Sequence, residues 1–332
     1  MGPVVPVASM KAVAVTEFGG SEGMDVVDRD EPEPGPGEVR IEVKAAGINF
    51  ADIMQRRGEY QGGPEPPYVP GMEAAGVVDA VGEGVGREVG DEVVGFLEQG
   101  GYAEYAIANA AGLFDLPEGM SFQEAAGFPV QFLTAHNCLN EWGGLEAGED
   151  VLVHAAAGGV GTAAVQIASH ADATVYGTAS TQEKLDLAAD LGCDHPIQYT
   201  EEDFVETVND LTDGEGVDLV LDGIGGETTT DSLKALTHFG RLVAYGAASG
   251  EPGQPNTADL LFNNHTVIGY HLGQAMYRDP GRVLSAVPEL TEMLQTGDLE
   301  VVVGHEFDLL DAAEAHQFIE DRKSSGKVVL VP

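Results

Sequence analysis

Basic side chains are scarce in this sequence. Fifteen Lys and Arg residues stand against 56 Asp and Glu residues, which gives a formal net charge of −41. A surface of that sign repels the phosphates of nucleic acids and of anionic lipid headgroups, so neither is expected as a partner. The acidic residues are spread along the chain, and such self-repulsion is relieved by strong screening, with a Debye length of roughly 3 Å at molar salt. The composition therefore predicts a protein from a halophile rather than an acidic tail that binds a partner.

Cysteine and long apolar segments are also in short supply. Cys138 and Cys193 form no CxxC pair, and the nine histidines form no HExxH or comparable cluster, so the sequence contains no recognisable zinc site. Lone cysteines suit a reducing compartment. No apolar run reaches about 18 residues and no signal peptide is evident. We expect a cytoplasmic protein without stable membrane insertion, and a hydrophobic fraction of 43% supports a sizeable core.

A glycine-rich turn is the most informative motif that is present. Residues 151–161 read VLVHAAAGGVG and lead into TAAVQIA, which is the pattern of a strand, a tight turn and a helix. The spacing Ala156-x-Gly158-x-x-Gly161 differs from the dinucleotide-binding GxGxxG only at its first position. It predicts that the backbone N–H groups at the start of the helix bind a pyrophosphate.

Strand-like and helix-like segments then alternate as far as residue 271. After the strand that begins at Val151, strands are expected at 173–178, 195–199, 217–222, 241–246 and 266–271, and helices at 180–191, 202–211 and 226–239. The segment VDLVLD at 217–222 is continuously apolar apart from its aspartates, as in a parallel sheet that is buried on both faces. Six strands with crossover helices predict a doubly wound α/β domain.

The end of the second strand indicates which cofactor binds. An acidic residue about 20 positions beyond the glycines normally binds the ribose hydroxyls of NAD and would repel a 2′-phosphate. Here the sequence is Gly177-Thr178-Ala179-Ser180, with no carboxylate, and Lys184 follows. A hydroxyl and an ammonium suit a phosphate, so the sequence favours NADPH over NADH. The alternative is that Ser180 caps a helix and that Lys184 is a solvated surface residue.

The first 130 residues lack this alternation of strands and helices. Val39, Ile41 and Val43 alternate with polar residues, as in a half-exposed strand, and turn-rich segments at 31–37 and 82–90 separate further short apolar runs. A mostly antiparallel, barrel-like domain is expected. Near the C-terminus, helices are expected at 283–294 and 310–319 and a strand at 328–331, but periodicity does not indicate which domain they pack on.

Several motifs together resemble one family. They are GINFADIMQRRGEY (47–60), PGMEAAGVV (70–78), GGYAEYA (100–106), VLVHAAAGGVGTAAVQIA (151–168), GYHLG (269–273) and SGKVVLVP (325–332). They resemble the zinc-independent medium-chain dehydrogenase/reductases, in particular the quinone oxidoreductases and the VAT-1-like branch. The resemblance implies a GroES-like, mostly β catalytic domain at 1–130 and 274–332, a Rossmann NADPH-binding domain at 131–273, a cofactor cleft where they meet, and a homodimer.

The resemblance also implies roles for individual residues. It places Asn49, Asp52 and Tyr60 at the catalytic centre, with Tyr60 donating to the substrate oxygen and the other two ordering the nicotinamide end. Met54 stands where some quinone reductases of the family have a second tyrosine. The implied cofactor contacts are Gln131, Thr134, Ala156, Gly158, Gly159, Val160, Gly161, Ser180, Lys184, Tyr199, Gly246 and Ala247, with Arg322 or Lys327 as a further candidate near the 2′-phosphate.

The resemblance also has implications for metal binding and for the substrate. Asn49 and Met72 stand where zinc-dependent relatives place a ligand cysteine and histidine, so no metal is expected. Without a Lewis acid, the acceptor must spread the incoming negative charge by conjugation, as quinones and α,β-unsaturated carbonyls do. We expect hydride transfer from NADPH to a small-molecule quinone or enone. Two alternatives stay open: an enoyl-thioester reductase, which would need a basic surface for the coenzyme A phosphate, and a VAT-1-like protein that binds NADPH with little turnover.

Overall fold

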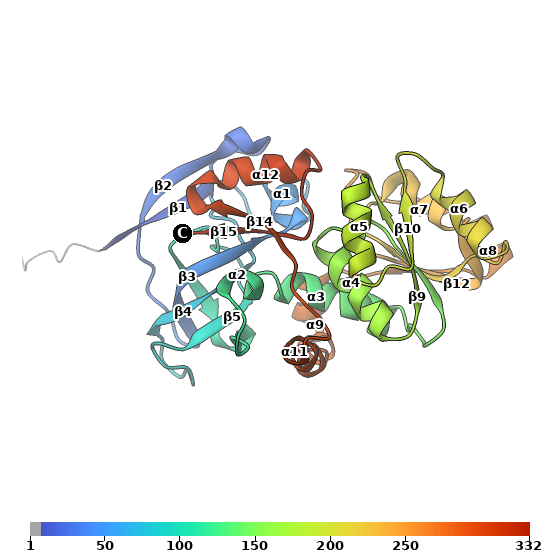
Figure 1. Ribbon diagram of the computed structural model, residues 1–332. Coiled ribbons are helices and arrows are strands. Elements are labelled where there is room, and N and C mark those ends of the chain that lie inside the picture. Colours follow the sequence, from blue (N-terminus) through green and yellow to red (C-terminus); the bar gives the residue numbers. More distant parts are fainter. Residues whose placement is uncertain (1–7) are drawn as a thin grey trace, which may run out of the picture. The chain divides into compact units, whose positions relative to one another are not determined.

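The computed structural model describes residues 8–332, and the chain divides into two compact units (Figure 1). One unit comprises the described residues up to Val130 together with Val301–Pro332, and the other comprises Gln131–Glu300. The segment 274–300 therefore lies with the second unit, whereas the limits expected from the sequence assigned it to the first. Its contacts explain the difference, because Asn137 Nδ2 donates to Val283 O at 3.3 Å and the Gln166 side chain hydrogen-bonds to the Glu300 backbone at 2.9 and 3.1 Å.

The second unit is built around a six-stranded sheet in the order β10-β9-β8-β11-β12-β13, and every pair is parallel. Its strands are β8 (Asp150–Val153), β9 (Thr174–Ala179), β10 (His195–Gln198), β11 (Val217–Asp222), β12 (Leu236–Ala244) and β13 (Thr266–Gly269). This order is that of a doubly wound nucleotide-binding sheet, which confirms the expected fold class. The apolar runs form the central strands because both faces are covered: Val151, Leu219 and Leu221 are fully buried.

Helices and one π-helical segment accompany this sheet. They are α3 (Pro129–His136), η3 (Asn137–Trp142), α4 (Gly159–His170), α5 (Gln182–Asp190), α6 (Phe204–Leu211), α7 (Gly226–Ser232), α8 (Thr257–Asn263), α9 (Leu272–Arg278), α10 (Pro280–Leu284) and α11 (Val287–Thr296). The helix expected at 226–239 is wrong beyond Ser232, because Leu236 already pairs with Val217 of β11 as a strand residue. The helix expected at 283–294 is two helices, since Pro288 lies in the first turn of α11 and starts a new helix there.

The first unit contains a seven-stranded sheet. The order is β14-β15-β3-β4-β5-β7, with β6 on β3, and β1 and β2 form a separate two-stranded sheet. The strands are β1 (Ser9–Val15), β2 (Met24–Asp30), β3 (Glu38–Ile48), β4 (Glu73–Val81), β5 (Glu92–Phe96), β6 (Tyr105–Asn109), β7 (Leu113–Asp115), β14 (Val303–Asp308) and β15 (Lys327–Val331). All pairs are antiparallel except β14 with β15. This largely antiparallel sheet confirms the expected GroES-like unit.

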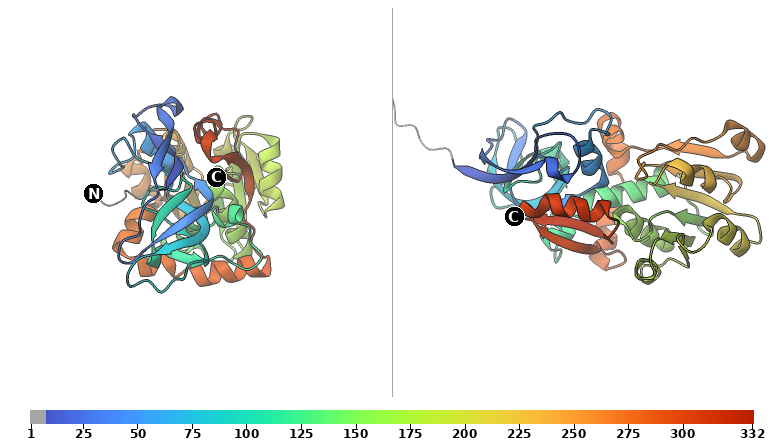
Figure 2. Two further views of the ribbon diagram at one scale, coloured as in Figure 1. Left: turned by 90° about the vertical axis from the view of Figure 1, so that its left-hand side faces the viewer. Right: turned by 90° about the horizontal axis from the view of Figure 1, so that it is seen from above.

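The C-terminal segment completes the first unit. Strand β15 pairs with β3, and Figures 1 and 2 show the C-terminal strands beside β3. The remaining helical elements of this unit are η1 (Ser21–Gly23), α1 (Phe50–Arg57), η2 (Ala110–Gly112), α2 (Phe122–Ala125), η4 (Leu309–Asp311) and α12 (Ala312–Glu320). Alternate residues of β3, Val39, Ile41 and Val43, lie in the core, as their period-two pattern predicts.

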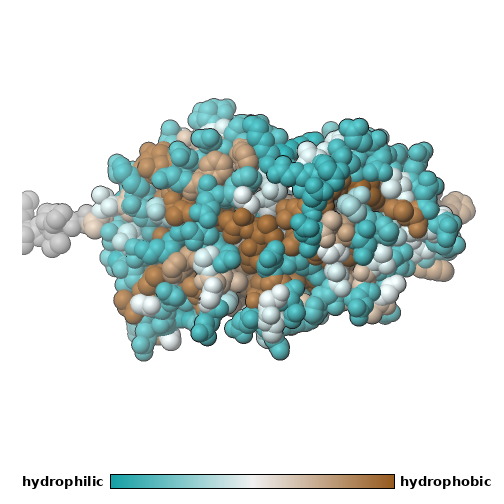
Figure 3. Space-filling model, in the orientation of Figure 1, coloured by the Kyte–Doolittle hydropathy of each residue, from teal (hydrophilic) through white to brown (hydrophobic). Residues whose placement is uncertain are grey.

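Hydrophilic residues are extensive on the face that Figure 3 shows, with apolar areas among them. Within residues 8–332, no helix combines the length and the apolar composition that crossing a bilayer would require.

Candidate active site

The glycine-rich turn connects β8 to α4. Helix α4 begins at Gly159 with Gly158 as its N-cap, and the first N–H groups of a helix have no partner within it. A Cβ on Gly161 would lie 2.1 Å from Ala155 O, so only glycine lets the helix approach the turn this closely. Residues 151–161 thus adopt the strand, turn and helix that the sequence predicts, with backbone donors just beyond the carboxyl end of β8.

A glycine in the next strand compensates for the alanine at the first motif position. Ala156 is fully buried, and a Cβ on Gly177 of β9 would lie 2.8 Å from the Ala156 methyl. Gly177 therefore leaves the space that Ala156 occupies. The sequence pattern gave no sign of this exchange, because it depends on the pairing of β8 with β9, in which Val153 lies opposite Gly177.

The other cofactor candidates follow the carboxyl ends of parallel strands. Ser180 follows β9, Tyr199 follows β10, and Gly246 and Ala247 follow β12. Tyr199 N donates to Ala179 O at 3.2 Å, so the ends of β9 and β10 adjoin. Open parallel sheets bind ligands beyond this edge.

The N-cap of helix α5 lies one residue later than the sequence indicates. Thr181, not Ser180, is its N-cap, and Thr181 Oγ1 accepts from Lys184 N at 3.4 Å. The alternative reading of Ser180 as a helix cap is therefore wrong. Lys184 is half-buried in the first turn of α5, and Tyr199 is 41% exposed.

Gln131 lies against the glycine-rich turn. Its side chain is 1% exposed, and its Oε1 is 2.4 Å from where a Cβ on Gly159 would lie. Neither Gln131 Oε1 nor Nε2 has a hydrogen-bond partner among the described residues. Thr134 is buried one turn further along α3. Buried polar atoms are nearly always hydrogen-bonded, so a buried amide without a partner at this turn is a feature of a ligand-binding site.

In the first unit, Asn49 and Asp52 begin helix α1. Asp52 Oδ2 accepts from Asn49 N at 2.8 Å, and the Asn49 side chain contacts Glu73 and Lys327. Lys327 is 3% exposed and its ammonium is committed to these two residues, so its assignment to the 2′-phosphate is wrong. The pairing of β15 with β3 places it in the interior of the first unit.

Burial shifts the acid–base properties around Asp52. It raises the pKa of the fully buried Asp52 to about 7, while the Asn49 N–H and the Lys327 charge lower it. Burial and then the Asp52 charge raise the pKa of Tyr60, which is half-buried. The same two causes raise the pKa of Tyr68 to about 12. Tyr60 therefore keeps its proton at neutral pH and can donate a hydrogen bond.

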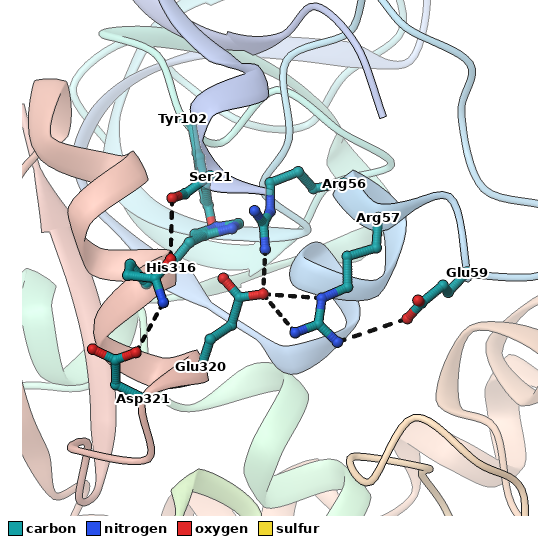
Figure 4. Close-up of polar contacts among 9 residues, drawn as sticks. Ser21, Arg56, Arg57, Glu59, Tyr102, His316, Glu320 and Asp321 are labelled. Carbon is teal, nitrogen blue, oxygen red and sulfur yellow. Dashed lines mark hydrogen bonds and ion pairs between the residues drawn. The ribbon is translucent and has the colours of Figure 1, made fainter. Parts of the chain in front are cut away.

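A buried polar network ties α1 to the C-terminal helix α12 (Figure 4). Tyr102 Oη lies 2.9 Å from His316 Nε2, and burial with the Arg56 charge lowers the pKa of His316 to about 3, so this histidine is neutral. Arg56 and Arg57 both contact Glu320 Oε1 at 2.6 Å. No sequence pattern indicates this network, because its members are far apart in the chain. The network braces helix α1, which carries Asp52.

The groups near Asn49 do not suit zinc. The side chains at the two compared positions are an amide and a thioether, and an ammonium lies 2.8 Å from the amide oxygen. Zinc in proteins is held by thiolate, imidazole and carboxylate ligands, and a neighbouring cation repels it. Among residues 8–332, no three His, Cys, Asp or Glu side chains are grouped so that they could hold a metal ion.

Comparisons with known proteins cover nearly the whole chain. Residues 35–118 match the alcohol dehydrogenase GroES-like domain and residues 159–290 the zinc-binding dehydrogenase family. The synaptic vesicle membrane protein VAT-1 homolog of Danio rerio is 36% identical over 341 residues, covering 96% of this chain and 69% of that protein. The 2-haloacrylate reductase of a Burkholderia species is 35% identical over 335 residues, covering 97% and 98%. The structure of Escherichia coli quinone oxidoreductase complexed with NADPH matches with a TM-score of 0.91 at 33% identity, covering 98% and 100%.

Proposed function

Because the chain belongs to the quinone oxidoreductase and VAT-1-like family of medium-chain dehydrogenase/reductases, we propose that it is an NADPH-dependent reductase of quinones or α,β-unsaturated carbonyls that works without a metal. The observation that carries the proposal is the glycine-rich turn beside the buried Gln131 amide, whose polar atoms have no partner among the described residues.

The residues at the carboxyl edge of the parallel sheet fit the cofactor. Gly158, Gly159, Val160 and Gly161 would offer backbone N–H groups to its pyrophosphate, and Ser180, Lys184 and Tyr199 would surround its 2′-phosphate. Ala156, Gln131, Thr134, Gly246 and Ala247 would line the remainder. When bound, NADPH supplies the hydride. The end of β9 carries no carboxylate that would repel a 2′-phosphate, which supports NADPH over NADH.

The first unit would supply the donor for the acceptor oxygen. The Tyr60 hydroxyl, kept protonated by burial and by the Asp52 charge, would donate to that oxygen as it becomes negative. Asp52 would act through Asn49, since its carboxylate accepts from the Asn49 N–H. Met54 is half-buried and apolar, which suits a hydrophobic acceptor. Asn49, Met72 and the Lys327 ammonium leave no donor set for zinc.

We propose further that the protein is a salt-adapted homodimer. Leu261 and Phe262 of α8 are 74% and 78% exposed, and Phe239 is 71% exposed on the adjacent strand β12. Strand β13 is an edge strand of the parallel sheet. Exposed apolar side chains and an open strand edge on so acidic a chain are features of a surface that a second copy covers.

A VAT-1-like binding protein with little turnover is the second candidate. It is favoured by the match to the Danio rerio protein over nearly the whole chain and by Met54 in place of a tyrosine. An enoyl-thioester reductase has less support, because 15 basic residues leave few to bind a coenzyme A phosphate.

NADPH oxidation in molar KCl, with a panel of quinones, enones and enoyl thioesters, tests the proposal. We expect turnover with quinones or enones well above the rate without an acceptor, and slower turnover with NADH. No turnover with any acceptor, together with a clear rise in melting temperature on adding NADPH, would contradict the enzyme and favour the binding protein. Turnover confined to thioesters would favour the enoyl-thioester reductase.

A further inference from the structure

A buried cation lies beside the candidate catalytic residues. Lys327, the first residue of β15, is 3% exposed, and its ammonium contacts Glu73 Oε1 at 2.5 Å and Asn49 Oδ1 at 2.8 Å. Glu73, the first residue of β4, is fully buried. Burying a lysine and a carboxylate is unfavourable unless each is paired and hydrogen-bonded. The pair is therefore a costly feature of a chain that has only 15 basic residues.

The three side chains form a closed triangle. Asn49 Nδ2 donates to Glu73 Oε1 at 2.8 Å, and this is the same oxygen that the Lys327 ammonium contacts. The other Glu73 oxygen accepts from Val130 N at 2.9 Å. The Asn49 oxygen faces an ammonium and its nitrogen faces a carboxylate, so turning the amide over would replace two attractions with two repulsions. The ion pair thus fixes the orientation of the Asn49 amide.

Two glycines leave the space that the lysine side chain fills. A Cβ on Gly47 of β3 would lie 2.6 Å from Glu73 Oε1 and 2.7 Å from Lys327 Cε. A Cβ on Gly127 would lie 3.2 Å from Lys327 Cγ. Backbone of β3 and of the residues after α2 therefore approaches the Lys327 side chain so closely that only glycine fits at these two positions.

The triangle also changes what the Asn49 amide can do. Its nitrogen has two hydrogens, of which Glu73 takes one, and Asn49 is half-buried rather than enclosed. An amide whose oxygen accepts from an ammonium is polarised, so its N–H groups become stronger donors. Donors that are fixed in advance stabilise a developing negative charge better than donors that must reorganise.

We propose that Lys327 is a positioning residue for the reduction: paired with Glu73, it orients and polarises the Asn49 amide so that the second Nδ2 hydrogen donates to the oxygen that becomes negative. This inference rests on the proposed reductase function. Lys327 itself touches neither cofactor nor substrate, and it acts through Asn49 alone.

Two variants and a matched control test the role of Lys327. Lys327→Met removes the charge and keeps an unbranched chain, and the double variant with Glu73→Gln also removes the carboxylate that would be left unpaired. In the double variant we expect kcat to fall on the order of 10- to 100-fold, as when one fixed donor is lost, with the NADPH Kd changed less than about threefold. Lys323→Met, which removes an exposed lysine paired with Asp321, is expected to keep the parental kcat.

The outcomes separate this inference from the proposed function. An active parent whose folded double variant keeps the parental kcat would overturn the role of Lys327 and leave the reductase intact. A parent without turnover would refute the reductase function. The contact of Lys327 and Glu73 with Asn49 is then tested by NMR of the Asn49 side-chain amide, whose signals are identified by their loss in Asn49→Asp. We expect two well separated Nδ2 hydrogen signals in the parent that converge in the double variant. Unchanged signals would refute the orientation of Asn49 by Lys327.

Discussion

The buried carboxyl of Asp52 allows a quantitative test of the site. Asp52 Oδ2 accepts from Asn49 N at 2.8 Å, while Oδ1 has no hydrogen-bond partner among the described residues. Burial raises the pKa of Asp52 to about 7 from an ordinary 3.8, and the Glu73 charge adds to this rise. The Asn49 N–H and the Lys327 ammonium act in the opposite direction without cancelling it.

The direction of the pH effect follows from this shift. A carboxyl with a raised pKa in the folded protein binds its proton more tightly there than in the unfolded chain. Its stabilising contribution is complete below pH 3.8 and is lost as the pH rises through about 7. The shift of about 3 pKa units makes the ionised form unfavourable by at most about 4 kcal/mol above that pH.

We therefore expect Asp52→Asn to be more stable than the parent at pH 8, by up to about 4 kcal/mol, because asparagine keeps an oxygen for the Asn49 N–H and cannot ionise. The difference in the free energy of unfolding should vanish near pH 4. Urea denaturation in molar KCl, followed by circular dichroism from pH 4 to 9, measures it. Glu124→Gln is the matched control, because Glu124 Oε2 accepts from Ser121 N at 2.8 Å in the same capping position of α2 but near the surface, and no gain is expected. Parallel pH curves for the parent and Asp52→Asn would show that the pKa of Asp52 is not raised in the folded protein.

Three further predictions concern cofactor, salt and chemistry. Lys184→Ala should weaken NADPH binding on the order of 10- to 100-fold with NADH binding little changed, since a charged hydrogen bond contributes roughly 1.5–3 kcal/mol. Titration of the variant with both cofactors measures this, with Gln182→Ala as the control. Equal losses of affinity for the two cofactors would mean that Lys184 has a structural role and does not bind the 2′-phosphate. Lowering KCl from molar to about 0.1 M lengthens the Debye length from roughly 3 to 10 Å and should lower the melting temperature, and a melting temperature indifferent to salt would contradict the halophile hypothesis. Tyr60→Phe should lower kcat more than it weakens NADPH binding, because the contact is strongest in the transition state, and unchanged turnover would remove Tyr60 from the reaction.

The fold of the nucleotide-binding unit could be predicted where strands are continuous apolar runs. The segment 217–222 is a strand with the expected limits, and the sheet has the six parallel strands that the alternation with helices predicts. The prediction failed at Leu236, where pairing with the distant Val217 overrode local helical character. The start of helix α5 also differs from the prediction, because the side chain of Thr181 caps the helix and that of Ser180 does not.

The candidate site was predictable only where its residues are neighbours in sequence. Asn49 and Asp52 belong to one helix start, so a short motif contains both. Lys327 and Glu73 lie 254 residues apart, and Tyr102 and His316 lie 214 apart, and no periodicity indicates such contacts. Lys327 shows the limit most clearly, because it was a candidate for the 2′-phosphate while the strand pairing buries it beside Asn49.

Turnover by metal-free protein is the sharpest test of the proposed reduction without a metal. The protein is dialysed against a chelator in molar KCl, its zinc content is determined by elemental analysis, and NADPH oxidation is followed with the best quinone or enone. We predict far less than one zinc per chain and the same kcat before and after chelation, because Asn49, Met72 and the Lys327 ammonium leave no zinc site there. About one tightly held zinc per chain, with activity lost on its removal and regained on its return, would show instead that the reduction depends on zinc.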